Sequence, residues 1–379
     1  MYFPTTEEQE MIRAMVEQFS RRQVAPQAEE RDKTGEFPDE LIKEMARLGL
    51  LGMMVPAEYG GSQVGAVAYV LALMEIAYAC ASTAVTMSVT NLSCEPLLNH
   101  GADEQKERLL TPLASGEMLG AFALTEPAAG SNLSEVRLKA EKKKDHYLLN
   151  GSKLFITNGS KAGIIIVLAR TAEGGSKGLS AFAVEKGTPG LSVGRKLEKM
   201  GLRGSDTVEI LLEDCRVPEE NRIGKEGDGF KVIAQALDSG RIGIAAQATG
   251  MIRACLDMAR NYASERRQFN KPLSGHQAIQ WMIADMATDY EAAKLMTLSA
   301  ASMKDQGREY TAEASMAKLF ASEAANRAAY NALQVHGGYG FTTEFPVERI
   351  YRDARVTTIY EGTSEVQRMV IHREAMKRR

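Results

Sequence analysis

The spacing of apolar residues divides the chain into three parts, and the first part has the helical period. The run Thr5-Thr6-Glu7-Glu8 is typical of a capping box, and apolar residues at helical spacing follow it. Residues 38–50 form an amphipathic stretch. Residues 67–98 carry only two acids, Glu75 and Glu95, which predicts helices that are covered on most sides.

From about residue 119 to residue 224 the apolar residues alternate with a period of two. Asn150-Gly151 lies between the strand-like runs 146–149 and 153–157, which predicts a hairpin turn at this position. Short strands separated by turn residues are typical of a small β-sandwich or barrel. Further strands are expected at 164–169, 179–184 and 208–212.

From residue 229 the helical period returns in long runs, which predicts an antiparallel bundle. The runs are 230–264, 274–303, 311–335 and 363–376. The expected fold is therefore α+β and multidomain. It has an N-terminal α-helical domain at residues 1–118, a central β-domain at residues 119–228 and a C-terminal four-helix bundle at residues 229–379. No G-x-G-x-x-G follows a predicted strand, so the usual dinucleotide-binding fold is not supported.

Composition narrows the class of protein. The chain has 46 basic and 49 acidic residues, and this near-balance argues against a nucleic-acid binder. The four cysteines are far apart and the five histidines lack metal-ligand spacing, so no metal site is expected and a reducing compartment is favoured. No leader segment and no apolar run of ~18 residues are visible, so we expect a bacterial cytoplasmic protein without membrane insertion.

One acid stands out as a candidate base. Glu361 lies between the β-branched stretch 356–359 and a helical pattern, with Tyr360 before it and Gly362 after it. A carboxylate at such a junction can project into a cleft, which is the geometry that a general base needs.

Two motifs in the β-domain have both a functional and an ordinary interpretation. In residues 124–132, the hydroxyls of Thr125 and Ser131 and the free N–H groups could hold a phosphate, or the segment is an ordinary Pro/Gly loop. In residues 155–159, Phe155 could stack on a planar ligand while Thr157 bonds its edge, or the segment is a plain strand end.

Two further motifs lie in the helical C-terminal part. Residues 266–272 place Arg266 and Arg267 at a helix end, where they could clamp a pyrophosphate or merely complement the helix dipole. The Gly337-Gly338 pair is first of all a helix C-cap, although it also opens a surface that could receive an adenine or a diphosphate.

Together these motifs resemble the acyl-CoA dehydrogenase family over nearly the whole chain. The likeness is strongest at residues 124–131, 151–159, 266–277 and 334–369. It implies the fold given above, FAD held between the β-domain and the bundle, and a homotetramer built as a dimer of dimers. It also implies that cofactor contacts come from Thr125, Ser131, Phe155, Thr157 and Thr363. A neighbouring subunit's FAD would be reached by Arg266, Phe269, Gln277, Gln334 and Gly338.

The resemblance also implies the reaction. Glu361 falls on the family's catalytic base, which removes the α-proton of an acyl-CoA thioester while flavin N5 takes the β-hydride to give the trans-2-enoyl-CoA. Electron-transfer flavoprotein would accept the electrons. Some branches place the base on a bundle helix, but that position is Gly240 here, as in the short- and medium-chain pattern. In the complex, we expect desolvation by bound substrate to raise the Glu361 pKa by more than a helix N-terminus lowers it.

The resemblance places the acyl pocket between the segment 78–98 and the region of Gly240 and Tyr360. The polar or small side chains there hint at a short, branched or cyclic acyl group. The pocket residues expected on this basis are Tyr78, Thr90, Asn91, Cys94, Glu95, Gly240, Arg241 and Tyr360. Asn132 and Glu135 depart from the family's first motif, so the packing of that loop is expected to differ.

Two alternatives remain at this point. Relatives of the same fold act as flavin oxidases or monooxygenases, and a helical assembly protein without catalysis is also compatible with the pattern. The Glu361-Gly362-Thr363 run favours the thioester reaction.

Overall fold

The computed structural model describes residues 2–377, so the outer ends of the expected domain bounds lie outside the described residues. The first helix, α1 (Glu7–Phe19), begins at Thr6 with a capping box. Its partner is Gln9, whose N–H donates to Thr6 Oγ1 at 3.2 Å. The other N-terminal helices are α2 (Ala28–Thr34), α3 (Asp39–Arg47), α4 (Gly65–Ala79), α5 (Ala81–His100), α6 (Asp103–Gln105) and α7 (Thr111–Ala114).

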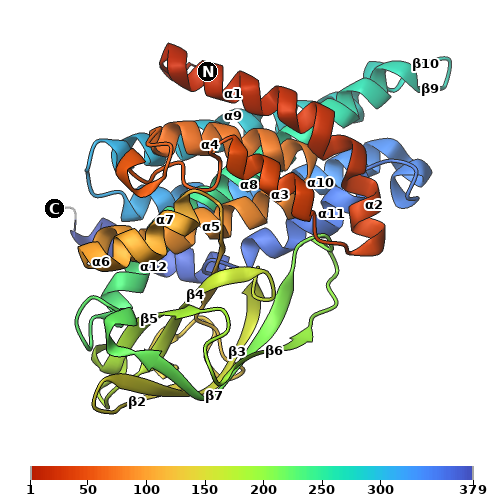
Figure 1. The fold of residues 1–379 in the computed structure, drawn as a ribbon. Helices are drawn as coiled ribbons and strands as arrows, with labels where there is room; N and C mark the ends of the chain where they lie inside the picture. The colour runs from red at the N-terminus through yellow and green to blue at the C-terminus, as the bar shows by residue number, and fades with distance from the viewer. Residues whose placement is uncertain (1, 378–379) are drawn as a thin grey trace.

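Helices α4 and α5 form the buried centre of this first part, as their sequence predicts (Figure 1). They pack on α8 (Gly229–Glu265), and α5 also packs on strand β1 (Leu119–Ala123). The acid Glu75 is tolerated inside because Arg13 and Arg253 lie 3.1 and 2.8 Å from its Oε1. The middle of α5 is thus enclosed by elements from all three parts of the chain.

The central part is one eight-stranded sheet, mostly antiparallel, lying below the helices in Figure 1. Its main path runs β6-β7-β3-β2-β4-β5-β8, and β1 pairs with β4 in parallel. The strands after β1 are β2 (Lys139–Lys142), β3 (His146–Thr157), β4 (Ala162–Arg170), β5 (Leu179–Glu185), β6 (Leu191–Lys196), β7 (Thr207–Pro218) and β8 (Arg222–Ile223).

The hairpin turn expected at Asn150-Gly151 is wrong, because β3 runs straight through these residues. The register against β7 shifts between Leu149 and Gly151, which marks an irregularity where Gly151 adopts φ +144°. The Asn150 side chain bonds Asp214 across the strands instead of closing a turn. The Asn-Gly signal therefore marks a bulge in a long strand.

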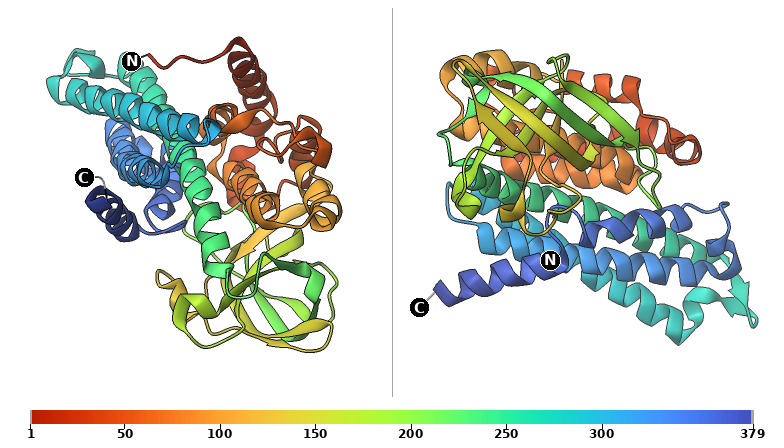
Figure 2. Two further views of the ribbon diagram at one scale, coloured as in Figure 1. Left: turned by 90° about the vertical axis from the view of Figure 1, so that its left-hand side faces the viewer. Right: turned by 90° about the horizontal axis from the view of Figure 1, so that it is seen from below.

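The C-terminal part is a bundle of α8, α9 (Gln277–Asp305), α10 (Thr311–His336) and α12 (Ser364–Lys377), close to the expected helical runs. In the left view of Figure 2, α8 (green) runs between the N-terminal helices (orange) and the other bundle helices (blue). The short hairpin β9 (Arg267–Gln268) and β10 (Lys271–Pro272) extends the far end of α8.

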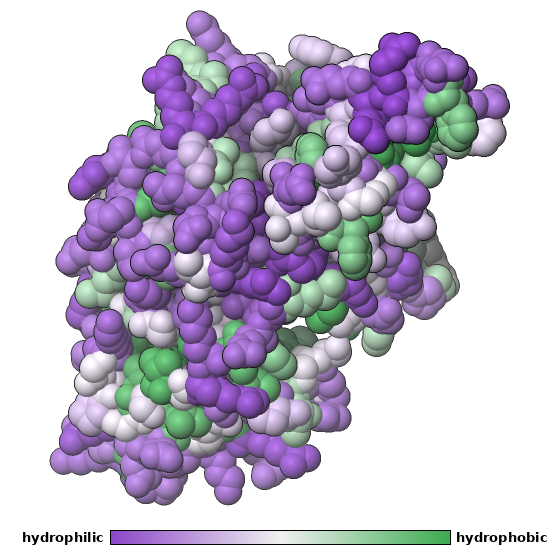
Figure 3. Space-filling view, turned by 90° about the vertical axis from the view of Figure 1, so that its right-hand side faces the viewer, coloured by the Kyte–Doolittle hydropathy of each residue, from purple (hydrophilic) through white to green (hydrophobic). Residues whose placement is uncertain are grey.

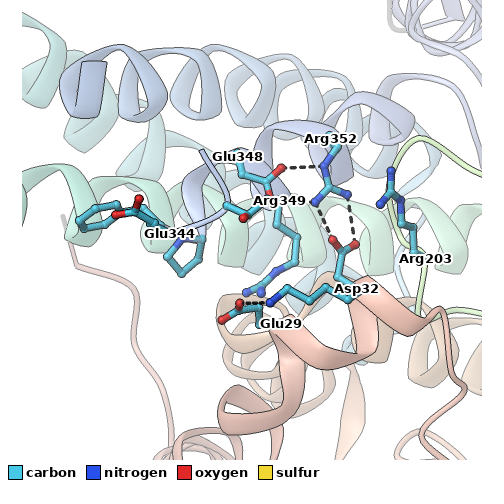
Figure 4. Close-up of a pocket in the computed structure, with 11 residues that line it drawn as sticks. Glu29, Asp32, Arg203, Glu344, Glu348, Arg349 and Arg352 are labelled. Carbon is cyan, nitrogen blue, oxygen red and sulfur yellow. Dashed lines mark hydrogen bonds and ion pairs between the residues drawn. The ribbon is translucent and has the colours of Figure 1, made fainter. Parts of the chain in front are cut away.

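Helix α11 (Val347–Ala354), which the pattern did not predict, joins the three parts of the chain. Arg352 reaches Asp32 of α2 with two hydrogen bonds of 2.6 and 3.1 Å. Asp353 accepts a 2.6 Å hydrogen bond from the Leu202 N–H, in the loop before β7. Figure 4 shows this charged junction, where α2 and α11 enclose a pocket of about 290 Å³.

Among the described residues, no helix combines the length and the apolar character that crossing a bilayer would require. Within the same residues, no group of three or more His, Cys, Asp and Glu side chains is arranged to hold a metal ion.

Candidate active site

Glu361 lies in a strained turn between two helical segments. The β-branched stretch before it forms a 3-10 helix (Arg355–Thr358), in which the Thr357 hydroxyl donates to the Ala354 carbonyl at 2.7 Å. Helix α12 follows at Ser364. Glu361 itself has φ +52° and Gly362 has φ +90°. A left-handed conformation is uncommon for a residue with a Cβ, so this turn is held by its surroundings.

The Glu361 carboxylate lies against α8 at Gly240, where an added side chain would crowd it. A Cβ on Gly240 would be 2.9 Å from Glu361 Oε2 and 3.4 Å from the Leu92 side chain. Oε2 is buried and has no hydrogen-bond partner among the described residues. The carboxylate is therefore close to α5 and α8, with one oxygen left free for chemistry.

Burial sets the proton affinity of this group. It raises the Glu361 pKa from 4.5 to about 7, and the cations Lys318 and Arg241 pull the pKa in the opposite direction. A carboxylate with such a pKa is suited to general-base catalysis near neutral pH.

The motif 124–132 forms a loop that a buried ion pair fixes to β3. Lys153 is fully buried, and its Nζ donates to Glu126 Oε1 and to the Leu124 carbonyl, both at 2.8 Å. The Leu154 N–H donates to the Thr125 carbonyl at 2.8 Å. These contacts bring Thr125 beside the motif that contains Phe155.

Phe155 and Thr157 lie at the end of β3, where the structure joins the sheet to α5. Phe155 is 62% exposed despite its apolar ring and has φ +62°. The buried Asn158 donates to the Gly120 carbonyl at 3.1 Å and to the Thr86 carbonyl at 3.3 Å. Leu92 of α5 and the Glu361 carboxylate both approach Gly240 of α8, within 3.4 Å of the position that an added Cβ would take, so α5 passes near both the β3 end and Glu361.

The arginine and double-glycine motifs lie at the far end of α8. Arg266 follows Gly240 by 26 residues, which is about 39 Å along a helix at 1.5 Å per residue. Arg266, Gln334 and Gly338 line one hollow of about 540 Å³. Phe269 is 88% exposed at the β9–β10 turn, and Gln277 is exposed at the start of α9. The single chain therefore does not bring this set to Glu361.

The expected acyl-pocket residues are not all grouped around Glu361. Tyr78 donates to Asp257 at 3.3 Å, and Asp257 follows Gly240 by 17 residues, about 25 Å along α8. Asn91 is used in the fold, since it bonds the Met53 N–H and the carbonyls of Leu50 and Met87.

The other polar residues of α5 also have partners. Glu95 is buried with Lys304 and accepts a 3.0 Å hydrogen bond from Ser239, the neighbour of Gly240. The Thr90 hydroxyl and the Cys94 thiol donate to backbone carbonyls one turn earlier on α5. The polarity of this segment thus supports packing, which weakens the sequence argument that it selects a short acyl group.

The residues next to the turn at Glu361 have defined partners. Arg241 pairs with Asp238, and Tyr360 donates to Gln247 Oε1 at 2.5 Å. Thr363 Oγ1 accepts the Val366 N–H at 3.3 Å, at the start of α12. Asn132 Oδ1 accepts the Ser134 N–H and its amide reaches Glu135, so these two departures from the motif bond each other.

Sequence reasoning missed two residues behind the turn. Lys318 of α10 and Gln367 of α12 are both fully buried and both donate to the Gly362 carbonyl, at 2.7 and 2.9 Å. The available signal was a single lysine on a stripe of small residues, Ala314, Ala317 and Ala321. A charge at a position with apolar spacing indicates a buried partner.

Three domain models of one family match the chain: the acyl-CoA dehydrogenase N-terminal domain at residues 6–117, middle domain at 121–215 and C-terminal domain at 227–376. An acyl-CoA dehydrogenase of Bacillus subtilis (strain 168) is 50% identical over 97% of both chains. Acryloyl-CoA reductase (NADH) of Anaerotignum propionicum is 46% identical over 100% of this chain and 97% of that one. The structure of butyryl-CoA dehydrogenase from Megasphaera elsdenii has a TM-score of 0.97 at 43% identity, covering 99% and 100% of the two chains.

Proposed function

The chain belongs to the acyl-CoA dehydrogenase family, and on this premise we propose that Glu361 is the base of its reaction. Enzymes of this family are FAD-dependent and oxidise acyl-CoA thioesters. In the proposed reaction Glu361 removes a proton from the α-carbon, the β-carbon loses a hydride, and the trans-2-enoyl-CoA is released. FAD, when bound, supplies the hydride acceptor, flavin N5. The observation that carries this proposal is the buried, unpartnered Glu361 Oε2 against Gly240.

The residues of the central part fit FAD. The N–H groups of Gly130 and Ser131 make no hydrogen bond with other described residues, and a Cβ on Gly130 would meet nothing within 4 Å. Such N–H groups bind anionic phosphates. The exposed Phe155 ring next to this loop offers an apolar face for a planar ring. In Figure 3 the surface is hollowed between the helical part and the sheet below it. We therefore assign cofactor contacts to Thr125, Ser131, Phe155, Thr157 and Thr363.

The backbone beside Glu361 would stabilise the negative charge that forms on the substrate. An α-proton next to a thioester is too weakly acidic for a carboxylate unless the carbonyl oxygen is stabilised as the proton leaves. The N–H of Glu361 has no acceptor among the described residues, and it belongs to the same residue as the base. A donor of this kind typically contributes ~3 kcal/mol of transition-state stabilisation.

We expect the reaction to slow in acid. Glu361 must be deprotonated to act, and its pKa is raised to about 7. The value of kcat/KM should therefore be constant above that pH and fall about tenfold per pH unit below it. Steady-state rates with an acyl-CoA and an artificial electron acceptor, from pH 5.5 to pH 9, test this. A profile that stays flat down to pH 5.5 would contradict the assignment of the base.

The residues at the far end of α8 support a site shared between subunits. Arg266, Gln334 and Gly338 are exposed around one hollow, yet Arg266 lies about 39 Å along α8 from Gly240. We propose that they contact the FAD of a neighbouring copy, with Phe269 and Gln277, in a homotetramer built as a dimer of dimers. We also propose electron-transfer flavoprotein as the acceptor of the electrons.

For the substrate we propose a short, branched or cyclic acyl-CoA. Support comes from two relatives named for short acyl groups, acryloyl and butyryl.

A substrate panel tests the function and the acyl group together. We expect kcat/KM for a four-carbon acyl-CoA to exceed that for a twelve-carbon one at least ~10-fold, since each misfitting methylene costs ~1–3 kcal/mol. The panel also includes branched and alicyclic thioesters, with an artificial acceptor. A preference for the twelve-carbon substrate would reverse the substrate proposal. Protein that stays colourless with added FAD, or turns over no thioester, would contradict the function itself.

A further inference from the structure

Two buried polar side chains hold the turn that carries Glu361. Lys318 Nζ donates to the Gly362 carbonyl at 2.7 Å. Gln367 Nε2 donates to the same carbonyl at 2.9 Å and to the Glu361 carbonyl at 3.2 Å. Both residues are 0% exposed. We propose that Lys318 and Gln367 are positioning residues that fix this turn so that the Glu361 carboxylate stays against Gly240.

The turn needs such support because its conformation is intrinsically unfavourable. Glu361 has φ +52°, in the left-handed region that a side chain disfavours, and Gly362 has φ +90°. A Cβ on Gly362 would lie 2.6 Å from Gln367 Nε2, so the amide occupies the space of the missing side chain. The two carbonyl oxygens of the turn are thus directed at donors on α10 and α12. Without these donors the peptide units are free to rotate, and the carboxylate moves with them.

Lys318 has a second effect, through its charge. A buried ammonium is unfavourable unless it has partners; here it donates to the Gly362 carbonyl and is attracted by the charge of the Glu361 carboxylate. The groups that act on Glu361 are Lys318 from α10 and Arg241 from α8, while Tyr69 from α4 and the adjacent Tyr360 respond to its charge. Lys318 lowers the Glu361 pKa against the effect of burial. Removing the ammonium should therefore raise that pKa further, whereas removing the neutral Gln367 should not.

The test compares two variants of the FAD-loaded enzyme. In Lys318→Met we expect kcat to fall at least tenfold, KM to stay within threefold, and the acid limb of the pH profile to move to higher pH. In Gln367→Met we expect a similar loss in kcat. The acid limb of the pH profile should stay at the same pH, because only the position of the Glu361 carboxylate changes and not the charge near it. An infrared titration of the Glu361 carboxyl, taken as wild type minus Glu361→Gln, follows the same pKa without turnover. The matched control is Arg327→Met, which removes an exposed cation of α10 that pairs with Asp289.

The outcomes separate this inference from the proposed function on which it rests. If both methionine variants keep kcat within twofold, or if Lys318→Met leaves the titration of Glu361 unmoved, the positioning role is wrong. If Lys318→Met does not fold or load FAD, Gln367→Met decides, and an unchanged kcat there also overturns the proposal. If Glu361→Gln itself remains fully active, the base assignment has failed instead.

Discussion

Glutamine in place of Glu361 is expected to lower acyl-CoA turnover by about 10²- to 10⁴-fold and to leave the flavin bound. Glutamine keeps the shape of the side chain but cannot accept the α-proton, and a positioned general base typically contributes this factor. The variant should not be less stable above pH 7. The folded state holds the Glu361 proton more tightly than the unfolded chain, so wild type loses stability as the pH rises from about 4.5 to about 7. The glutamine side chain does not titrate, so the stability of the variant does not fall with pH for this reason.

The measurement is anaerobic mixing of the yellow protein with substrate. Wild type should bleach as the flavin is reduced, whereas the variant should stay yellow. Glu365→Gln is the matched control, because Glu365 is an exposed acid four residues further along, on α12. A Glu361→Gln protein that bleaches at the normal rate would remove Glu361 from the mechanism.

A second large effect is expected from Lys153→Met, which removes the cation of the buried pair with Glu126. Breaking such a pair from one side leaves an uncompensated charge and typically costs ~3–5 kcal/mol. We expect the lower end of this range, because Glu126 keeps hydrogen bonds from the N–H groups of Arg137 and Leu138 at 2.7 and 2.9 Å. The loop from Thr125 to Ser131 should loosen as well, so the purified protein should retain less FAD.

Urea unfolding followed by circular dichroism, together with the FAD content, measures both effects. Lys161→Met is the matched control, since Lys161 pairs with Asp39 near the surface, where an ion pair contributes ~1 kcal/mol or less. The double variant Lys153→Met/Glu126→Gln should recover part of the lost stability, because it also removes the Glu126 charge that Lys153→Met leaves without a cation. Equal stability of Lys153→Met and Lys161→Met would show that the pair does not hold the loop.

The sequence predicts the helices well where burial dominates the pattern. The stretch 67–98 has almost no charged residue, and it forms the buried pair α4 and α5. The long runs of the last part reappear as α8, α9, α10 and α12, because their apolar residues recur at helical spacing. Prediction fails at Asn150-Gly151, because a dipeptide that suits a turn also suits a bulge, and only the neighbouring strand β7 decides between them.

Some residues of the candidate site could be predicted from the local sequence and others could not. The motif around Glu361 was visible from local residues, whereas Lys153, Lys318 and Gln367 act through partners 27, 44 and 5 residues away that no local pattern reveals. The polar residues Asn91 and Glu95 were visible too, but their partners within the fold were not. Polarity in a buried helix does not show whether the side chain faces a ligand or satisfies the backbone of a neighbouring segment.

Helix α11 connects the turn at Glu361 to the other two parts of the chain. It bonds α2 through Arg352 and the loop before β7 through Asp353, and the segment that follows leads directly to Glu361. A substitution that breaks either contact is therefore expected to shift the turn at Glu361, so the alignment of this carboxylate depends on residues of the N-terminal and central parts as well.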